Sequence, residues 1–223
     1  MVADSSPTSA ADAGRAVTTV VHLVRHGEVA NPDGVLYGRI PGFGLSENGR
    51  LMAKTAADYL AGRDVSVVRS SPLERARQTA APIAERFGLR FEIDERLIES
   101  WNRFEGLRVS PGALLRAPRR LVWLRNPFLP SWGEPYHQVA ARVLAAAADA
   151  ARAARGREAV CVSHQLPIWV SRLAAERRRL WHDPRRRQCS LGSVTSLTYV
   201  DDELVEVSYA DPSGSGSLRA AGA

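Results

Sequence analysis

The order of hydrophobic and polar positions predicts buried strands that alternate with amphipathic helices. Short apolar runs between turn residues are typical of strands, and we place six at 17–25, 65–68, 90–93, 158–162, 194–200 and 204–209. Apolar residues recur at helical spacing within 46–62, 71–88, 136–155 and 166–174. This alternation indicates an α/β fold: a three-layer α/β/α sandwich with a mainly parallel central sheet.

The chain of 223 residues is long enough for one such domain, which we expect at residues 17–210. Residues 1–16 are small and polar and predict a disordered leader, and residues 211–223, with Gly and Ser, predict a flexible tail. Pro, Arg and large aromatic residues interrupt the pattern at 107–135. We expect this segment to be an irregular, lid-like insertion.

Two helices carry recognisable start signals. Ser71 is the predicted N-cap of the second helix, with Pro72 at its first position and Glu74 closing a capping box. Ser131 and Glu134 form a similar box before the third helix, which gives Glu134 a structural alternative to a role in the site.

The composition is that of a soluble globular protein, with 45% hydrophobic and 24% charged residues. The net charge is +6, and Lys54 is the single lysine among 30 basic residues. A basic balance suits anionic substrates and also non-specific attraction to nucleic acid. We interpret the runs Arg177–Arg179 and Arg185–Arg187 as solvated faces, and we do not expect a nucleic-acid partner.

The two cysteines, Cys161 and Cys189, have neither metal-ligand spacing nor a disulfide framework. Cys161 lies in an apolar run and is predicted to be a buried free thiol, which favours a reducing cytoplasm. No apolar stretch approaches the roughly 20 residues that span a bilayer, so we expect a cytoplasmic protein without a membrane partner. The sequence specifies no oligomeric state.

Side chains suited to phosphoryl transfer follow three of the predicted strands. Arg25 and His26 end the first strand, and Gly27 after them lets backbone and ligand approach closely. Arg75 lies one turn into the helix after the second strand, and His164 ends the fourth. Because the carboxyl ends of parallel strands meet at one edge of a sheet, we expect these groups to form one anion site.

Four blocks of sequence, in order, carry a family resemblance. They are Leu23–Glu28, Ser70–Ala80, the segment around Glu99, and Val160–His164. Together they resemble the histidine phosphatase superfamily, the phosphoglycerate-mutase-like proteins of branch 1. The resemblance implies chemistry with no metal and no cofactor.

The resemblance also implies a role for each matching residue. His26 would attack phosphorus, while Arg25, Arg75 and His164 hold the phosphoryl oxygens and Glu99 protonates the leaving group. Asn31 and Gln165 are candidate phosphate contacts, and Gln165 departs from the glycine usual after the second histidine. Gly133 and Glu134, with Arg142 further on, are also similar to the family. The candidate catalytic residues are His26, Glu99, His164, Arg25 and Arg75.

The physical chemistry of these groups is consistent with those roles. Guanidinium groups at Arg25 and Arg75 would keep His26 neutral and nucleophilic near pH 7. His164 would be cationic when phosphate is bound. Glu99 must be protonated to act as an acid, which requires desolvation or an acidic neighbour such as Glu105.

The sequence favours a metal-independent phosphomonoester hydrolase that acts on a small phosphorylated metabolite through a phosphohistidine. The longer patterns of true phosphoglycerate mutases are absent after the first block, so a mutase is the second hypothesis. A protein that binds a phosphorylated ligand or nucleic acid without turnover is the third. Of the other residues, His22 is expected to be packed, His137 to line the lid or face solvent, and His182 and Arg77 to be solvated.

Overall fold

The computed structural model describes residues 16–108 and 133–214. Among them, six strands form one sheet in the order β3-β2-β4-β1-β5-β6. The strands are β1 (Thr18–Arg25), β2 (Val65–Ser70), β3 (Phe91–Ile93), β4 (Glu158–Ser163), β5 (Val194–Val200) and β6 (Glu203–Ala210). The first four are mutually parallel, whereas β5 and β6 form an antiparallel hairpin beside β1.

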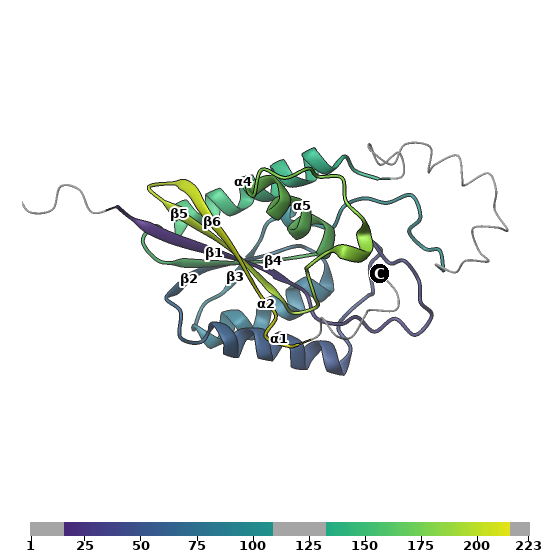
Figure 1. Cartoon of the computed structure of the whole chain (residues 1–223). Helices are drawn as coiled ribbons and strands as arrows, with labels where there is room; N and C mark the ends of the chain where they lie inside the picture. Colours follow the sequence, from purple (N-terminus) through teal and green to yellow (C-terminus); the bar gives the residue numbers. More distant parts are fainter. Residues whose placement is uncertain (1–15, 109–132, 215–223) are drawn as a thin grey trace, which may run out of the picture.

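Helices cover both faces of this sheet. They are α1 (Glu47–Leu60), α2 (Glu74–Arg86), α4 (Tyr136–Ala153) and α5 (Gln165–Ala175). Figure 1 shows α4 and α5 on one face and α1 and α2 on the other. The predicted α/β/α sandwich with a mainly parallel sheet is therefore confirmed. Most of the predicted lid at 107–135, most of the leader and most of the tail lie outside the described residues.

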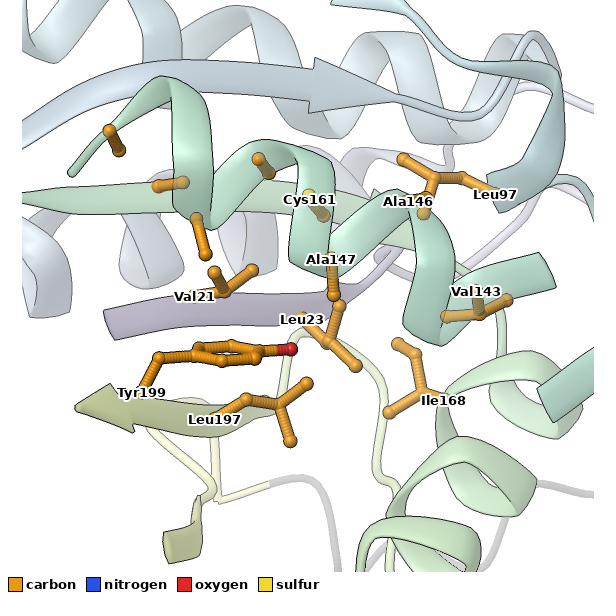
Figure 2. Packing of buried hydrophobic residues seen from close by; sticks show 14 of the residues in the cluster. Val21, Leu23, Leu97, Val143, Ala146, Ala147, Cys161, Ile168, Leu197 and Tyr199 are labelled. Carbon is orange, nitrogen blue, oxygen red and sulfur yellow. The ribbon is translucent and has the colours of Figure 1, made fainter. Parts of the chain in front are cut away.

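The two faces of β1 explain why its sequence is an almost continuous apolar run. Val21 and Leu23 pack with α4 on one face, and Val24 packs with α1 and α2 on the other. Figure 2 shows the first of these cores, where Ala146 and Ala147 of α4 lie against the strands. Small side chains let this helix approach the sheet closely, which accounts for its alanine-rich sequence.

Cys161 lies in this core as a buried free thiol, as predicted. Burial raises the pKa of its thiol to about 12, so the group is uncharged at neutral pH. His22, on β1, is also packed as expected. Its ring lies within 2.6 Å of a Glu158 carboxylate oxygen and 2.8 Å from the Ser196 hydroxyl.

The predicted start of the second helix is wrong. The chain remains extended through Ser71, whose N–H donates to the Val162 carbonyl at 2.9 Å and continues the pairing of β2 with β4. Leu73 is the N-cap, and α2 begins at Glu74. Ser71, still paired in the sheet, is not the N-cap of α2: its hydroxyl accepts from the Leu73 N–H before the helix at 3.4 Å and contacts His164 at 2.7 Å.

The register of the sheet brings three strand ends together. Arg25 of β1 pairs with Ser163 of β4, and Ser70 of β2 pairs with Val162, the residue before it. The residues that follow these strands, His26, Ser71 and His164, therefore leave the sheet at the same edge.

Gly49 in the first turn of α1 fixes how closely this helix approaches the segment after β1. A Cβ at Gly49 would lie 2.0 Å from the Glu28 carbonyl oxygen, a backbone atom that cannot rotate away. We expect Gly49→Ala to destabilise the protein by about 1–3 kcal/mol in urea unfolding, because the helix must shift. Gly62→Ala is the matched control, since a Cβ there meets nothing within 4 Å. Equal stabilities of the two variants would contradict this packing.

Candidate active site

Two histidines form the centre of the candidate site. His26 follows β1 and His164 follows β4, with 2% and 0% of their surface exposed. Their ring centroids are 5.1 Å apart, and the ring planes are tilted by 58°. The parallel pairing of β1 with β4 thus brings together two residues that are separated by most of the chain.

The hydrogen bonds of His26 define its tautomer. Its Nδ1 lies 2.8 Å from the Gly27 carbonyl oxygen, and since a carbonyl can only accept, Nδ1 carries the proton. The lone pair of the neutral ring is therefore on Nε2. Burial, and then the positive charges of Arg75 and Arg25, hold the pKa of His26 well below its usual value. His26 is neutral near pH 7, as a nitrogen nucleophile requires.

His164 is held by a single hydrogen bond. Its Nε2 lies 2.7 Å from the Ser71 hydroxyl, and its buried Nδ1 has no partner among the described residues. Burial first, and then Arg75, His26 and Arg25, lower the pKa of His164 well below its usual value. Without an anion the ring is neutral, and its expected cationic form in the presence of phosphate stays a prediction.

Arg25 and Arg75 bring two buried positive charges to the histidines, with 4% and 1% of their surface exposed. Arg25 donates from Nη1 to the Cys189 carbonyl at 2.6 Å, and Arg75 donates from Nη2 to the Gly38 carbonyl at 2.6 Å. The Nε of each is buried without a hydrogen bond in the part of the chain that the structure describes. Neither forms an ion pair with a described carboxylate, so this edge of the sheet is suited to an anion.

Glu99 lies just after the 3₁₀ helix η1 (Glu95–Leu97) and is partly buried. Its Oε1 accepts a hydrogen bond from its neighbour's N–H, that of Ser100, at 2.7 Å. Burial raises the pKa of Glu99, against the opposing positive charges of Arg75, Arg187 and Arg25. Desolvation thus favours its protonated form. Glu105, the acidic neighbour considered from sequence, instead lies against Gly38.

Glu134 supports the segment that carries Glu99. Its carboxylate accepts from Arg142 Nε at 2.8 Å and from Arg39 Nη2 at 3.0 Å. Arg39 also donates from Nε to the Glu99 carbonyl at 2.7 Å, and Arg142 donates from Nη1 to the Arg96 carbonyl at 2.5 Å. Glu134 therefore joins two arginines that hold residues 96–99. The predicted capping box is wrong, because α4 begins at Tyr136 with Pro135 as its N-cap, so that Glu134 precedes the helix. Ser131 lies outside the described residues.

Asn31 and Gln165 occupy different kinds of position. Asn31 donates to the Val35 carbonyl at 2.8 Å and accepts from the Val35 N–H at 3.0 Å, so its side chain holds its own loop. Phosphate contact by Asn31 stays a prediction that requires these bonds to open. Gln165 begins α5 next to His164, and its side chain lies 3.5 Å from the Cys189 carbonyl, the acceptor that Arg25 uses.

Two residues expected in solvent are not there. His182 is half-buried, and its ring centroid lies 5.4 Å from that of Tyr136 and 5.9 Å from that of Trp169. Arg187 is also partly buried, and its Nε donates to His182 Nε2 at 2.8 Å. Nothing in a run of three arginines distinguishes one turned inward from two that are exposed. The other residues that we expected in solvent are exposed. They are Arg77, His137, Arg177–Arg179, Arg185 and Arg186.

A surface cavity of about 660 Å³ lies beside this site, between residues 40–43 and α2. Arg75 is part of its wall, but neither histidine is. Among the described residues, no group of three or more His, Cys, Asp and Glu side chains could hold a metal ion. The helices within the described ranges are too short or too polar to cross a bilayer.

Comparison with known proteins identifies the family. Residues 21–212 match the profile of the histidine phosphatase superfamily (branch 1), and the chain belongs to that superfamily. The family resemblance seen in the four blocks is thereby confirmed.

Relatives agree with this assignment. An uncharacterized protein of Mycobacterium tuberculosis is 58% identical over 195 residues, which cover 87% of this chain and 96% of the relative. The structure of mycobacterial glucosyl-3-phosphoglycerate phosphatase is similar with a TM-score of 0.69 and 29% identity, covering 87% and 97% of the two chains. A 2,3-bisphosphoglycerate-dependent phosphoglycerate mutase of Thermoplasma acidophilum is 42% identical over 78 residues, which are 34% of this chain and 39% of the mutase.

Phosphate binding at this edge of the sheet can be measured as thermal stabilisation. Inorganic phosphate should raise the melting temperature of the wild type, because a ligand at about 100 times its Kd stabilises the folded state by about 2.7 kcal/mol. Arg75→Gln should abolish most of that increase. Arg77→Gln, two residues away on the exposed side of α2, should retain it. The same increase in all three proteins would place the anion elsewhere.

Proposed function

We propose that this protein is a metal-independent phosphomonoester hydrolase that acts on a small phosphorylated metabolite through a phosphohistidine. The observation that carries the proposal is a neutral His26 whose lone pair is on Nε2, beside two buried guanidinium groups that form no ion pair with a carboxylate of residues 16–108 or 133–214. The nucleophile and the positive charges that stabilise phosphoryl transfer are thus present together.

In the first step, His26 Nε2 attacks phosphorus and forms an N–P bond while the ester P–O bond breaks. Arg25, Arg75 and His164 stabilise the charge on the phosphoryl oxygens. Among the described residues, the buried donors Arg25 Nε and Arg75 Nε have no hydrogen-bond partner, and neither does His164 Nδ1. A phosphoryl oxygen would satisfy both arginine donors, and also His164 Nδ1 once it carries a proton.

Glu99 completes the first step by giving its proton to the leaving alcohol oxygen. The raised pKa of its carboxyl supports this role. In the second step the Glu99 carboxylate accepts a proton from water while the water oxygen attacks phosphorus. The N–P bond then breaks, which releases inorganic phosphate and returns both His26 and Glu99 to their starting states.

Similarity to proteins of known activity supports hydrolysis of a phosphorylated metabolite. The structural relative described above is a phosphatase, and other structures of it contain inorganic phosphate or vanadate. Its substrate, by its name, is a phosphorylated sugar acid. This similarity points to the same general class of substrate for the present chain.

The role of His26 is tested by hydrolysis of an aryl phosphate in the presence of a chelator. We expect wild-type activity to survive the chelator and His26→Ala to reduce kcat by about a thousandfold or more, because the covalent route is lost. His137→Ala changes an exposed histidine and is the control for folding and assay. Comparable rates of wild type and His26→Ala would rule out the phosphohistidine, and an inactive, folded wild type would favour a binding protein.

The role of Glu99 is tested with leaving groups of different basicity. An alkyl alkoxide needs a proton, so Glu99→Gln should lower kcat for an alkyl phosphate by about 10²–10⁴-fold. A nitrophenolate leaves without one, so the loss for a nitrophenyl ester should be much smaller. Equal losses for both esters would contradict general acid catalysis by Glu99.

The pH profile of the same reaction has a defined sign. Activity needs neutral His26, whose pKa is lowered, so the acidic limb should lie below the usual histidine range. Activity on alkyl phosphates also needs protonated Glu99, whose pKa is raised, so activity should fall as the pH rises through that pKa. Glu99→Gln should flatten this alkaline limb. A profile that keeps rising with pH in the wild type would exclude Glu99 as the acid.

A mutase is the second candidate, and the similarity to a phosphoglycerate mutase over 78 residues favours it. A mutase would return the phosphoryl group of His26 to a second hydroxyl of the substrate rather than to water. Product analysis with a phosphoglycerate separates the two activities, because a phosphatase releases inorganic phosphate and a mutase forms an isomer.

A further inference from the structure

Arg187 is the least expected positive charge near the candidate site. It follows the short 3₁₀ helix η3 (Pro184–Arg186), and unlike its two exposed neighbours it turns back toward the protein. Its Nε donates to His182 Nε2 at 2.8 Å, and its Nη1 lies 3.4 Å from the Gln165 side-chain oxygen. Arg187 is therefore oriented by two neutral groups.

A chain of polar contacts joins Arg187 to the phosphate-binding arginines. Gln165, which contacts Arg187, also reaches the Cys189 carbonyl with its amide nitrogen at 3.5 Å. Arg25 donates to the same carbonyl at 2.6 Å. The side chain of Gln165, at a position where the family usually has glycine, thus lies between Arg25 and Arg187.

The charges around Arg187 are unbalanced. No carboxylate of the described residues forms an ion pair with it, whereas arginines elsewhere in the fold, such as Arg142 and Arg172, pair with glutamates at 2.8 and 2.7 Å. Glu99 and Arg187 act on each other electrostatically, but Glu99 is also subject to the charges of Arg75 and Arg25. When Glu99 carries its proton, Arg25, Arg75 and Arg187 remain without an ion pair to any carboxylate that the structure describes.

The transferring phosphoryl group would bind two of these guanidinium groups. Arg25 and Arg75 flank the histidines, so they would hold the transferring phosphoryl oxygens. The contacts through Gln165 and the Cys189 carbonyl place Arg187 beside Arg25. There it also interacts electrostatically with Glu99, which would donate its proton to the leaving oxygen. The charge of Arg187 therefore falls on the side of the leaving group.

We propose that Arg187 is a specificity residue that binds a second anionic group, a carboxylate or another phosphate, on the alcohol part of the substrate. The assignment rests on the proposed function for which side of the site the alcohol occupies. Gln165 acts as a positioning residue that holds the Arg187 guanidinium at the rim. The substrates would be phosphomonoesters of acidic alcohols, and neutral alcohols of the same size would bind less well.

Binding to the His26→Ala protein tests this without turnover. The probes are 3-phosphoglycerate and glycerol 3-phosphate, 2-phosphoglycerate and glycerol 2-phosphate, and 1,3-propanediol bisphosphate with its monophosphate. Calorimetry should give a preference for the acidic member of at least one pair. Adding Arg187→Ala should reduce that preference about tenfold to a hundredfold, as expected for one charged hydrogen bond. The affinity for the member of the pair that lacks the second anionic group should change much less. The pair that responds distinguishes a carboxylate from a second phosphate.

Arg186→Ala, the exposed neighbour with the same charge, is the matched control and should keep the preference. Melting curves of each variant show whether it is folded. The proposal is overturned if no pair shows a preference, if neither member binds, or if Arg187→Ala weakens both members equally. The last result would mean that Arg187 only supports the fold around His182. Because binding is measured without hydrolysis, failure of the phosphatase proposal would appear separately, as an inactive wild type.

Discussion

The candidate site depends on positive charge held out of water at one edge of a parallel sheet. Arg25 and Arg75 are almost fully buried, and each is anchored by a backbone carbonyl, with no ion pair to a carboxylate in the described part of the chain. A carboxylate partner would satisfy the guanidinium and compete with an incoming anion, whereas a carbonyl orients it and leaves the charge intact. Burial first, and then these charges, lower the pKa values of His26 and His164, so the same desolvated edge keeps the two histidines neutral and the arginines without a counter-charge among the described residues.

Such an arrangement is stable only within a rigid frame. The alanine-rich face of α4 packs directly on the strands, and Gly49 brings α1 against the backbone that follows β1. On the other side of the site, Glu134 joins Arg39 and Arg142, which hold the segment of Glu99. The segment of Glu99 is thus held through its backbone, by Arg39 at the Glu99 carbonyl, while the Glu99 side chain accepts a hydrogen bond at Oε1 from the Ser100 N–H.

Much of the fold could be predicted because the local signals were strong. Both faces of β1 and β4 are buried, so their sequences are nearly unbroken apolar runs, and the predicted strand limits agree with the structure to within about two residues. The predicted start of α2 was wrong because local capping rules favoured Ser71. Pairing with β4 keeps that residue extended, and the helix begins at Glu74 instead.

The sequence by itself determined which groups meet. Arg25, His26 and His164 follow buried parallel strands, and any right-handed α/β sandwich brings such strand ends to one edge. Only the tertiary structure decided the charge state and direction of each group. Burial sets the pKa values of His26 and Glu99, and a contact with His182 turns Arg187 inward while its neighbours stay exposed. Desolvation, and contacts between residues far apart in the sequence such as that of His182 with Tyr136, depend on packing in three dimensions, which local spacing does not encode.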